Sequence, residues 1–298
     1  MSAVNAEPLD ELGAKVARGA AQDRRLGALL QAEGKLSASE VQQVLQMQES
    51  WGYRFGEAAV RLNLITVDDL RRAMAKQYDL PHLLPDNERI SSEIVVAYEP
   101  FHACAEQFRA LRTQLLIRWT NTRTLHRTLA LVGVAPAEGR SYLAANLAVA
   151  FAQLGERTLL IDADLRRPRQ HKIFDVPDRV GLSSVLGGRA DRAALVAVPE
   201  FGALTLLPAG APPPNPLELL SRDTLGAFLH ELHSAFDVIL LDTPATTTCA
   251  DAQSVAVHAR SALVVARRDR TTLRDTSRLV RTLGDAGALT LGTVFNGH

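Results

Sequence analysis

Residues 129–141 read Leu-Ala-Leu-Val-Gly-Val-Ala-Pro-Ala-Glu-Gly-Arg-Ser. The first six form an apolar run that is typical of a buried strand, and residues 142–152, which follow, have the composition of a helix. The loop between them has the pattern of a phosphate-binding loop in which Arg140 stands at the position of the motif's lysine. Strand, loop and helix in this order predict a nucleotide site, and the arginine leaves the chemistry at that site open.

The loop itself supplies the candidate nucleotide contacts. They are Pro136, Ala137, Glu138, Gly139, Arg140, Ser141 and Tyr142. Backbone N–H groups at a helix start can surround a phosphate, and an alanine at 137 preserves that cradle only if its φ is negative. Arg140 keeps the positive charge but brings a planar fork in place of a compact ammonium, so contact with β- and γ-phosphates would have altered geometry.

Acidic residues end two further apolar runs. The run over residues 158–162 ends on Asp162, with Asp164 two residues further on, and the run over residues 236–242 ends on Asp242. The carboxyl ends of parallel strands open into the ligand crevice of an α/β sheet. Mg²⁺ prefers carboxylate and hydroxyl oxygens, so the aspartates and Ser141 predict a magnesium site beside the nucleotide. The alternative is that these acids cap helices or pair with Arg166 and Arg167.

A tandem repeat occupies the N-terminal part of the chain. Residues 25–48 align with residues 54–77 at an offset of 29 residues. Both copies have arginine, glycine and glutamine at the first, third and last positions. Each copy predicts a short helix, a turn at Gly34 or Asn63, and a second helix opened by a capping box, Ser37 with Glu40 or Thr66 with Asp69. We therefore expect a small all-α domain over residues 23–80, after a flexible tail over 1–22.

Both copies resemble a 24-residue motif that occurs in tandem, with a five-residue spacer, in the N-terminal domains of type II secretion and pilus ATPases. In some members of that family the motif binds cyclic di-GMP. The resemblance implies a cyclic di-GMP site at Arg25, Leu26, Gly27, Leu30, Gly34, Arg54, Phe55 and Gly56. An arginine can pair with phosphate or stack on guanine, and a glycine lets the backbone approach. The alternative is a helical docking domain in which these residues build only turns and core.

Prolines at 81, 85 and 100 interrupt helical periodicity, so residues 81–102 are expected to connect two domains. The next segment, residues 106–118, predicts an amphipathic helix with Phe108 and Leu115 toward the core. Glu106, Arg109 and Arg112 share its other face, which is either a solvated charge stripe or an oligomerisation surface.

Residues 103–298 resemble the bacterial tyrosine kinases of polysaccharide export, in particular the chain-length-determinant autokinases, a branch of the partition and septum-site P-loop ATPases. The resemblance rests on six stretches in order: EQFRALRTQL from 106, LLIDADLRRPRQH from 159, GLSSVL from 181, LPAGAPPPNPLELL from 207, VILLDTP from 238, and a closing LGTVFN that ends at Asn296. It implies an α/β P-loop NTPase fold with a mostly parallel, doubly wound sheet over residues 103–298, preceded by the all-α repeat domain.

The resemblance also implies roles for individual residues. Asp162 would accept the proton of the substrate hydroxyl and Arg140 would assist transfer, while Ser141 with Asp164 and Asp242 would hold Mg²⁺. Asn296 would lie near the adenine of ATP or ADP. The EQFRALRTQL helix, with Glu106, Arg109 and Arg112, would assemble the chain into a ring. A membrane-anchored polysaccharide co-polymerase would present its cytoplasmic segment as the activating partner.

Two departures from that family bear on activity. The chain has Pro136-Ala-Glu-Gly-Arg-Ser-Tyr142 where the family has P-G-E-G-K-S-T, and it lacks the C-terminal tyrosine cluster, because its tyrosines are Tyr53, Tyr78, Tyr98 and Tyr142. Besides a tyrosine kinase, two functions remain open. One is a nucleotide-dependent scaffold with weak catalysis, and the other is a positioning ATPase of the partition type, although Ala135 replaces the signature lysine that many of those carry.

The composition adds exclusions. Equal numbers of basic and acidic residues, 33 each, predict no nucleic-acid partner. Cys104 and Cys249 match no metal-ligand spacing. No apolar run approaches the roughly 20 residues that span a bilayer, and no leader pattern opens the chain. We expect a cytoplasmic protein that reaches the inner membrane only through a partner.

Overall fold

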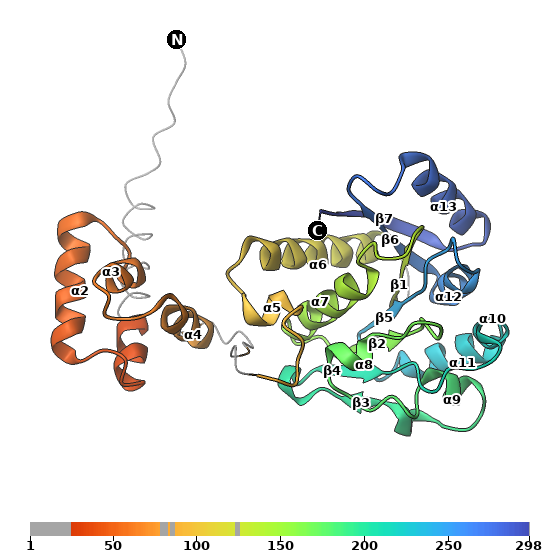
Figure 1. Ribbon diagram of the computed structural model, residues 1–298, viewed down its shortest axis with the longest axis horizontal. Helices are drawn as coiled ribbons and strands as arrows, with labels where there is room; N and C mark the ends of the chain where they lie inside the picture. The colour runs from red at the N-terminus through yellow and green to blue at the C-terminus, as the bar shows by residue number, and fades with distance from the viewer. Residues whose placement is uncertain (1–24, 78–82, 84–86, 123–125, 298) are drawn as a thin grey trace, which may run out of the picture. The chain divides into compact units, whose positions relative to one another are not determined.

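The computed structural model describes residues 25–77, 83, 87–122 and 126–297. The chain divides into two compact units, Met1–His82 and Leu83–His298, and the ribbon of the second runs from orange to blue (Figure 1). The tail expected over residues 1–22 lies outside the described residues. Each unit is described by itself below.

The N-terminal unit is helical, as the repeat predicts. Residues 25–32 are helical and are followed by α2 (Ala38–Trp51), α3 (Phe55–Arg61) and α4 (Val67–Gln77). Equivalent apolar positions of the two copies meet in one core, which includes Leu26, Leu30, Leu36, Phe55 and Ile65. The turns at Gly34 and Asn63 both have positive φ, 69° and 55°, and asparagine is one of the few other residues that tolerates this conformation.

Both predicted capping boxes are present. The Ser37 side chain accepts from the Glu40 amide, and the Glu40 carboxylate accepts from the Ser37 amide at 2.7 Å. Asp69 makes the same reciprocal pair with Thr66 and also pairs with Lys35 at 2.9 Å, which ties the turn of the first copy to the last helix of the second. The repeat therefore fixes both the helix starts and their mutual packing.

We expect Asp69→Ala to destabilise the N-terminal unit by about 1–2 kcal/mol, because it removes this cap and the ion pair with Lys35. Bonds from Thr66, then from Lys35, lower the pKa of Asp69 to about 2 from its ordinary 3.8. Its contribution is therefore complete above about pH 4 and is lost as the pH falls toward 2. Amide hydrogen exchange of α4 in the whole chain measures this, with exposed Asp68→Ala as the control expected to change little.

The second unit is an α/β domain. Its seven-stranded sheet has the order β3-β4-β2-β5-β1-β6-β7, parallel throughout except for the antiparallel β3–β4 pair. The strands are β1 (Arg127–Gly133), β2 (Thr158–Asp162), β3 (Val196–Ala197), β4 (Leu204–Leu207), β5 (Val238–Asp242), β6 (Ser261–Arg267) and β7 (Leu289–Asn296). This arrangement confirms the mostly parallel, doubly wound sheet.

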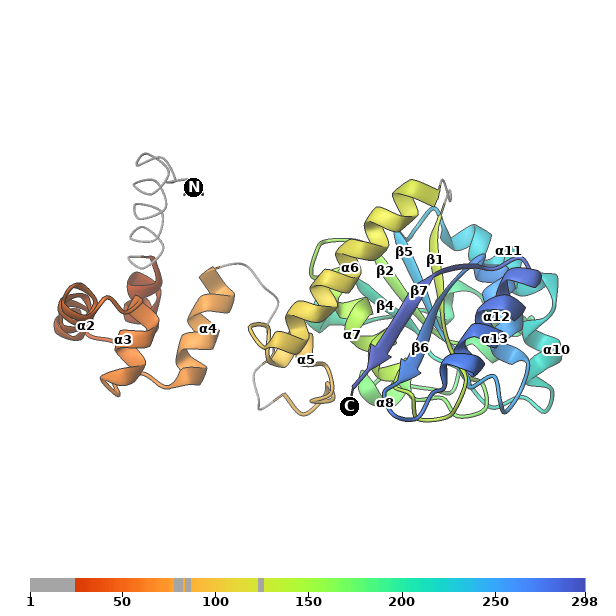
Figure 2. The same ribbon diagram turned by 90° about the horizontal axis from the view of Figure 1, so that it is seen from above.

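Helices cover both faces of that sheet (Figure 2). The longer ones are α6 (Ala103–Thr122), α7 (Arg140–Ala152), α11 (Asp223–Leu232), α12 (Asp251–Ala259) and α13 (Leu273–Asp285). Short segments complete the set: α5 (Val95–Tyr98), α8 (Gln170–Ile173), α9 (Leu182–Leu186), η1 (Arg192–Ala194), η2 (Pro199–Phe201) and α10 (Pro216–Leu220). Successive side chains of β1 point to opposite faces, so Leu129 and Leu131 join the core under α6 and α7, and Ala130 and Val132 join the core under α11 to α13.

The segment over residues 81–102, which the prolines predict to be a connection, packs into the second unit over residues 90–98. Ile90, Ile94 and Val96 are buried in the core of the second unit, and the Val96 amide donates to the Asn146 side chain at 3.3 Å. The expected connection over residues 81–102 is therefore wrong for residues 90–98. The prolines prevent a long helix there, but the apolar side chains between them still pack against α7 and α6.

Candidate nucleotide site

The loop after β1 and the start of α7 form one wall of a pocket of about 790 Å³ at the carboxyl ends of the strands. Of the loop residues expected to contact nucleotide, the pocket is lined by Pro136, Ala137, Gly139, Arg140, Ser141 and Tyr142, together with Asn296 from the end of β7. Glu138 is the exception, since it is 1 % exposed and lies behind the loop. Gly139 has a φ of 91°, and a Cβ there would clash with the Asn296 side-chain amide. Only glycine fits this approach.

Ala137 departs from the expected conformation. Its φ is 61°, whereas preservation of the phosphate cradle was expected to require a negative value. A left-handed alanine costs roughly 1–2 kcal/mol, so its surroundings must hold it there. The Arg267 guanidinium, at the end of β6, donates to the Ala137 carbonyl at 2.9 Å and supplies such a restraint.

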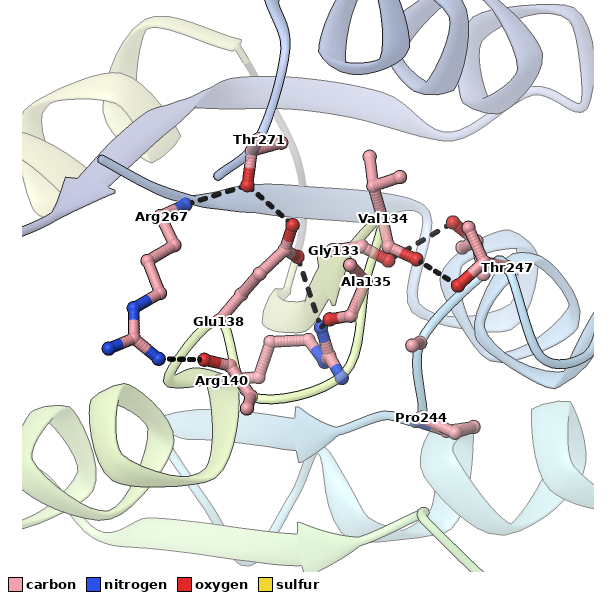
Figure 3. Close-up of polar contacts among 12 residues, drawn as sticks. Gly133, Val134, Ala135, Glu138, Arg140, Pro244, Thr247, Arg267 and Thr271 are labelled. Carbon is pink, nitrogen blue, oxygen red and sulfur yellow. Dashed lines mark hydrogen bonds and ion pairs between the residues drawn. The ribbon is translucent and has the colours of Figure 1, made fainter. Parts of the chain in front are cut away.

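Arg140 is anchored inside the protein. Its Nε donates to the Thr243 carbonyl at 3.0 Å, and its Nη1 donates to the Ala135 carbonyl at 2.8 Å and to the Glu138 carboxylate at 3.2 Å. Figure 3 shows Glu138 between Arg140 and Thr271, whose hydroxyl donates to the other carboxylate oxygen at 2.6 Å. The side chain is 8 % exposed. The guanidinium therefore braces the loop from behind.

The three aspartates lie at the expected edge, at different depths. Asp162 and Asp242 face each other in register on β2 and β5 and are 0 % and 1 % exposed, whereas Asp164 lines the pocket. The carboxylate of Asp162 accepts backbone N–H groups of Asp164, Arg169 and Gln170 at 2.9–3.2 Å. Asp162 thus organises the turn after β2 from beneath the pocket floor.

The acids partly follow the alternative interpretation. Asp164 accepts the backbone N–H groups of Arg166 and Arg167 at 3.2 and 2.9 Å, which is a local cap. The Arg166 side chain instead pairs with buried Asp251 at 2.7 Å. Capping does not exclude a metal, because each carboxylate oxygen has two lone pairs.

Burial dominates the electrostatics of the floor. It raises the pKa of Asp162 well above the ordinary value, and the adjacent charge of Asp242 raises it further. Burial also raises the pKa of Asp242 to about 6, although bonds from Gln170 and Ser141 oppose the rise. One oxygen of Asp242, Oδ1, is buried without a hydrogen-bond partner. A buried acceptor of this kind fits a cation.

Sequence patterns missed Gln170 and most of the pocket's arginines. The Gln170 side chain donates to Asp242 at 2.8 Å and to the Ser141 carbonyl at 3.1 Å, so it joins β5 to the phosphate loop. Arg167, Arg169 and Arg267 line the pocket. The available signal was position, since Arg267 ends an apolar strand just as the aspartates do.

Comparison with known proteins agrees with this geometry. A family model described as "Cellulose biosynthesis protein BcsQ" matches residues 126–281. The putative tyrosine-protein kinase CapB of Staphylococcus aureus is 32 % identical over 205 residues, which cover 69 % of this chain and 89 % of CapB. The chain belongs to the bacterial tyrosine-protein kinases. The kinase domain of the Escherichia coli tyrosine kinase ETK matches it with a TM-score of 0.65 and 30 % identity, over 71 % of this chain and 83 % of that domain.

The kinase fold is that of a P-loop ATPase. The septum site-determining protein MinD of Pyrococcus horikoshii, solved as a complex with Mg-ADP, matches with a TM-score of 0.52 and 27 % identity over 58 % of this chain and 70 % of that one. Among the described residues of the kinase chain, no helix has both the length and the apolar character needed to cross a membrane.

The remaining predicted residues of this kinase lie apart from the pocket. On α6, Glu106 is exposed, Arg109 donates to Glu106 and to the Pro100 carbonyl, and Arg112 donates to the Ala150 carbonyl at 2.7 Å. The charge stripe is therefore partly used within the chain, to fix α6 against α7.

In the N-terminal unit, the residues implied for cyclic di-GMP divide into two groups. Leu26, Leu30 and Phe55 are core residues, Gly27 has the Phe55 ring packed on it, and Gly56 has Leu70 packed on it. The exposed members are Arg25, Arg54 and Gly34. Packing therefore accounts for the apolar residues and for Gly27 and Gly56, whereas Arg25 and Arg54 lie outside the core.

Proposed function

We propose that this chain is an ATP- and Mg²⁺-dependent protein-tyrosine kinase that acts in the synthesis or export of a polysaccharide. The observation that carries the proposal is a single pocket where a phosphate loop, a helix start, Asp164 and several arginines converge above the buried pair Asp162 and Asp242. The names of the relatives support the class of reaction and the link to polysaccharide.

The donor set fits magnesium and nucleotide. Ser141, Asp164 and Asp242 would hold Mg²⁺, and the unpartnered Oδ1 of Asp242 fits that role. The bound ion would neutralise charge on the transferring phosphoryl group. The backbone at Gly139 and at the start of α7 would surround the phosphates, and Asn296 would lie beside the nucleotide. Ala137, whose φ is positive, does not meet the condition expected for its part of the cradle.

Arg140 supports loop structure more directly than transfer. Its guanidinium is buried and engaged by Ala135, Glu138 and Thr243. Arg167, Arg169 and Arg267 line the pocket and are more exposed, so they supply most of the charge toward the phosphates, although Arg169 also pairs with Glu93 and Arg267 donates to the Ala137 carbonyl. We expect slow turnover as a result, because transfer depends on the position of the charges. Arg140→Lys restores an unbranched ammonium that can reach the pocket, and we expect it to raise the rate about tenfold or more.

The test is phosphotyrosine formation by the whole chain with ATP and Mg²⁺, with and without the cytoplasmic segment of a polysaccharide co-polymerase. Phosphotyrosine that depends on Mg²⁺ supports the proposal. ATP hydrolysis without phosphotyrosine would indicate a positioning ATPase, and nucleotide binding without either reaction would indicate a scaffold. A rate that falls in Arg140→Lys, in a variant whose free energy of unfolding is unchanged, would show that Arg140 itself serves transfer.

The acceptor tyrosine is expected to lie outside the kinase core. The Tyr98 hydroxyl donates to the Ile90 carbonyl at 2.5 Å, and the Tyr142 hydroxyl lies half-buried against the Cys104 sulfur. Burial raises the pKa of Tyr142, which opposes its use as a nucleophile. The proposed target is Tyr53 in the N-terminal unit, Tyr78, which lies outside the described residues, or a tyrosine of another protein, and mass spectrometry of the reaction products would identify it.

We further propose that the kinase works in the cytoplasm as a nucleotide-dependent ring, held at the inner membrane by its co-polymerase partner. Glu106 on α6 is the most exposed residue of the charge stripe, although Arg109 donates to it, and it is the one that a neighbouring subunit could reach. Light scattering with ADP or ATP tests the ring. Glu106→Ala is expected to reduce assembly, and unchanged assembly would remove α6 from the interface.

Regulation by cyclic di-GMP is a separate proposal for the N-terminal unit. It rests on Arg25 and Arg54, which occupy equivalent positions in the two copies and are both exposed. We expect the double variant Arg25→Ala/Arg54→Ala to abolish the heat of cyclic di-GMP binding in calorimetry. Arg71→Ala is the control, because Arg71 is a half-exposed arginine on α4 that pairs with Asp68. No heat from the unaltered chain would leave this unit as a docking domain.

A further inference from the structure

Three histidines lie together on the second unit, away from the nucleotide pocket. They are His126, which precedes β1, and His230 and His233 at the end of α11. Their ring nitrogens lie within 4.8 Å of one another, and within the part of the chain that the structure describes no other group of three histidine, cysteine or acidic residues meets this condition. The acidic residues of the phosphate site therefore do not form a group as close as these three histidines.

Its place in the fold separates it from the kinase chemistry. His126 stands at the amino end of β1, whereas the phosphate loop follows the carboxyl end of the same strand. A strand of seven residues is roughly 20 Å long, so the two sites are at opposite edges of the sheet. The cluster borders a second pocket of about 420 Å³, lined in part by His126 and His233.

One imidazole is already oriented. The His233 Nε2 lies 2.9 Å from the hydroxyl of Thr128, a buried residue of β1. With Nε2–H donating to that hydroxyl, the lone pair is on Nδ1, which is buried and has no hydrogen-bond partner. An imidazole whose far nitrogen is held by an outer partner is the usual arrangement at a metal centre.

The other two imidazoles can converge on the same point. His230 and His233 are three residues apart at the end of a helix, so they share one face. The His126 ring is stacked on the His233 ring, with 3.8 Å between centroids and 8° between planes, so His126 must rotate out of this stack before a nitrogen of each ring can contact one ion. His126 and His230 are exposed and can rotate to direct a nitrogen inward. The carboxyl end of α11 carries the negative end of the helix dipole, which favours a cation.

Two of the basic groups at this edge are paired with acids, Arg127 with Glu156 at 3.0 Å and Arg157 with Asp237 at 2.7 Å. The charge of Arg260 does act on His233, since it contributes to lowering the pKa of that imidazole after burial and the two other histidines, so a bound cation must outweigh this one positive charge. Imidazole ligands favour zinc, copper or nickel over calcium or magnesium.

We propose that His126, His230 and His233 bind a divalent transition metal, with Zn²⁺ as the probe ion, through three imidazole nitrogens and one open position. A bound ion ties the start of β1 to the end of α11, and so joins two elements that are more than 90 residues apart in sequence. Three protein ligands and a fourth from solvent satisfy the tetrahedral preference of zinc.

The test is calorimetry of Zn²⁺ with the whole chain, prepared without a histidine tag and freed of metal by chelation. We expect one ion per chain, and a visible absorption band of a tetrahedral site when Co²⁺ is used instead. Removing an outer partner of a ligand costs roughly 10–100-fold in metal affinity, so His126→Gln and His230→Gln should each cost more than about 100-fold. Both residues are exposed, so both variants should fold.

Two further variants complete the experiment. Thr128→Val removes the hydroxyl that orients His233 and should weaken binding about 10–100-fold while the strand is kept. His102→Asn, at the start of α6, removes an imidazole outside the cluster and should leave the affinity unchanged. No binding by the unaltered chain, or an affinity in the His126→Gln and His230→Gln variants equal to that of the unaltered chain, would overturn the proposal.

Discussion

Arg140→Ala is expected to lower the free energy of unfolding of the kinase unit by about 3–5 kcal/mol, a large loss for a residue of a ligand-binding loop. The side chains of Arg140 and Glu138 are 8 % and 1 % exposed. Without the guanidinium, the Glu138 carboxylate would remain buried with the Thr271 hydroxyl as its side-chain donor, and the Ala135 and Thr243 carbonyls would lose a donor. An uncompensated buried charge is the costly part of this loss.

Urea denaturation monitored by tryptophan fluorescence measures this loss in the free energy of unfolding. Trp119, in the kinase unit, is 2 % exposed, and Trp51, in the N-terminal unit, is 71 % exposed, so a Trp51→Phe background leaves one reporter in the unit of interest. Arg169→Ala removes an exposed pair with Glu93 and should cost less than about 1 kcal/mol. In the double variant Glu138→Ala/Arg140→Ala the losses should fall short of additivity by about 1–3 kcal/mol. A loss below 1 kcal/mol in Arg140→Ala would show that the guanidinium does not brace the loop.

Features set by neighbouring residues could be predicted from the sequence. The apolar run over residues 158–162 is β2 to the residue, and the two capping boxes are present because their partners are three residues apart. The phosphate loop and the strand-end aspartates were placed at one edge because strand, loop and helix have little freedom of connection.

Features that depend on residues far apart in the chain could not be predicted from the sequence. The direction of Arg140 depends on the Thr243 carbonyl, 103 residues away, and the sequence gives no sign of that contact. Ala137 keeps a positive φ because Arg267 reaches its carbonyl from another strand. The histidine cluster combines residues next to the start of β1 and at the end of α11, which the sequence does not place together. The prolines around residues 90–98 predict a connection because they interrupt helical periodicity, but Ile90, Ile94 and Val96 pack into the core of the second unit.

Asp242→Asn is expected to reduce Mg²⁺-dependent phosphotyrosine formation by about 100-fold or more. The substitution keeps the size of the side chain and removes the charge of a ligand proposed for the metal, on which phosphoryl transfer relies. The rate is measured with saturating ATP, and ATP affinity with and without Mg²⁺ is measured by fluorescence. Asp237→Asn is the matched control, because Asp237 stands at the opposite end of β5 and pairs with Arg157. The rate of phosphotyrosine formation by Asp237→Asn should equal that of the unaltered chain.

The same substitution has an opposite effect on stability, and this separates a lost ligand from a damaged fold. Burial raises the pKa of Asp242 to about 6 from 3.8, so in metal-free protein ionisation opposes folding. Below about pH 4 the group is protonated in both states, and stability decreases as the pH rises from about 4 to about 6. Asp242→Asn removes that dependence, and the charge that raises the pKa of Asp162. At pH 8 without Mg²⁺ the variant should therefore unfold at a higher temperature than the unaltered chain, while it is nearly inactive. A lower unfolding temperature with the same loss of activity would mean that Asp242 serves the fold, and the magnesium assignment would then fail.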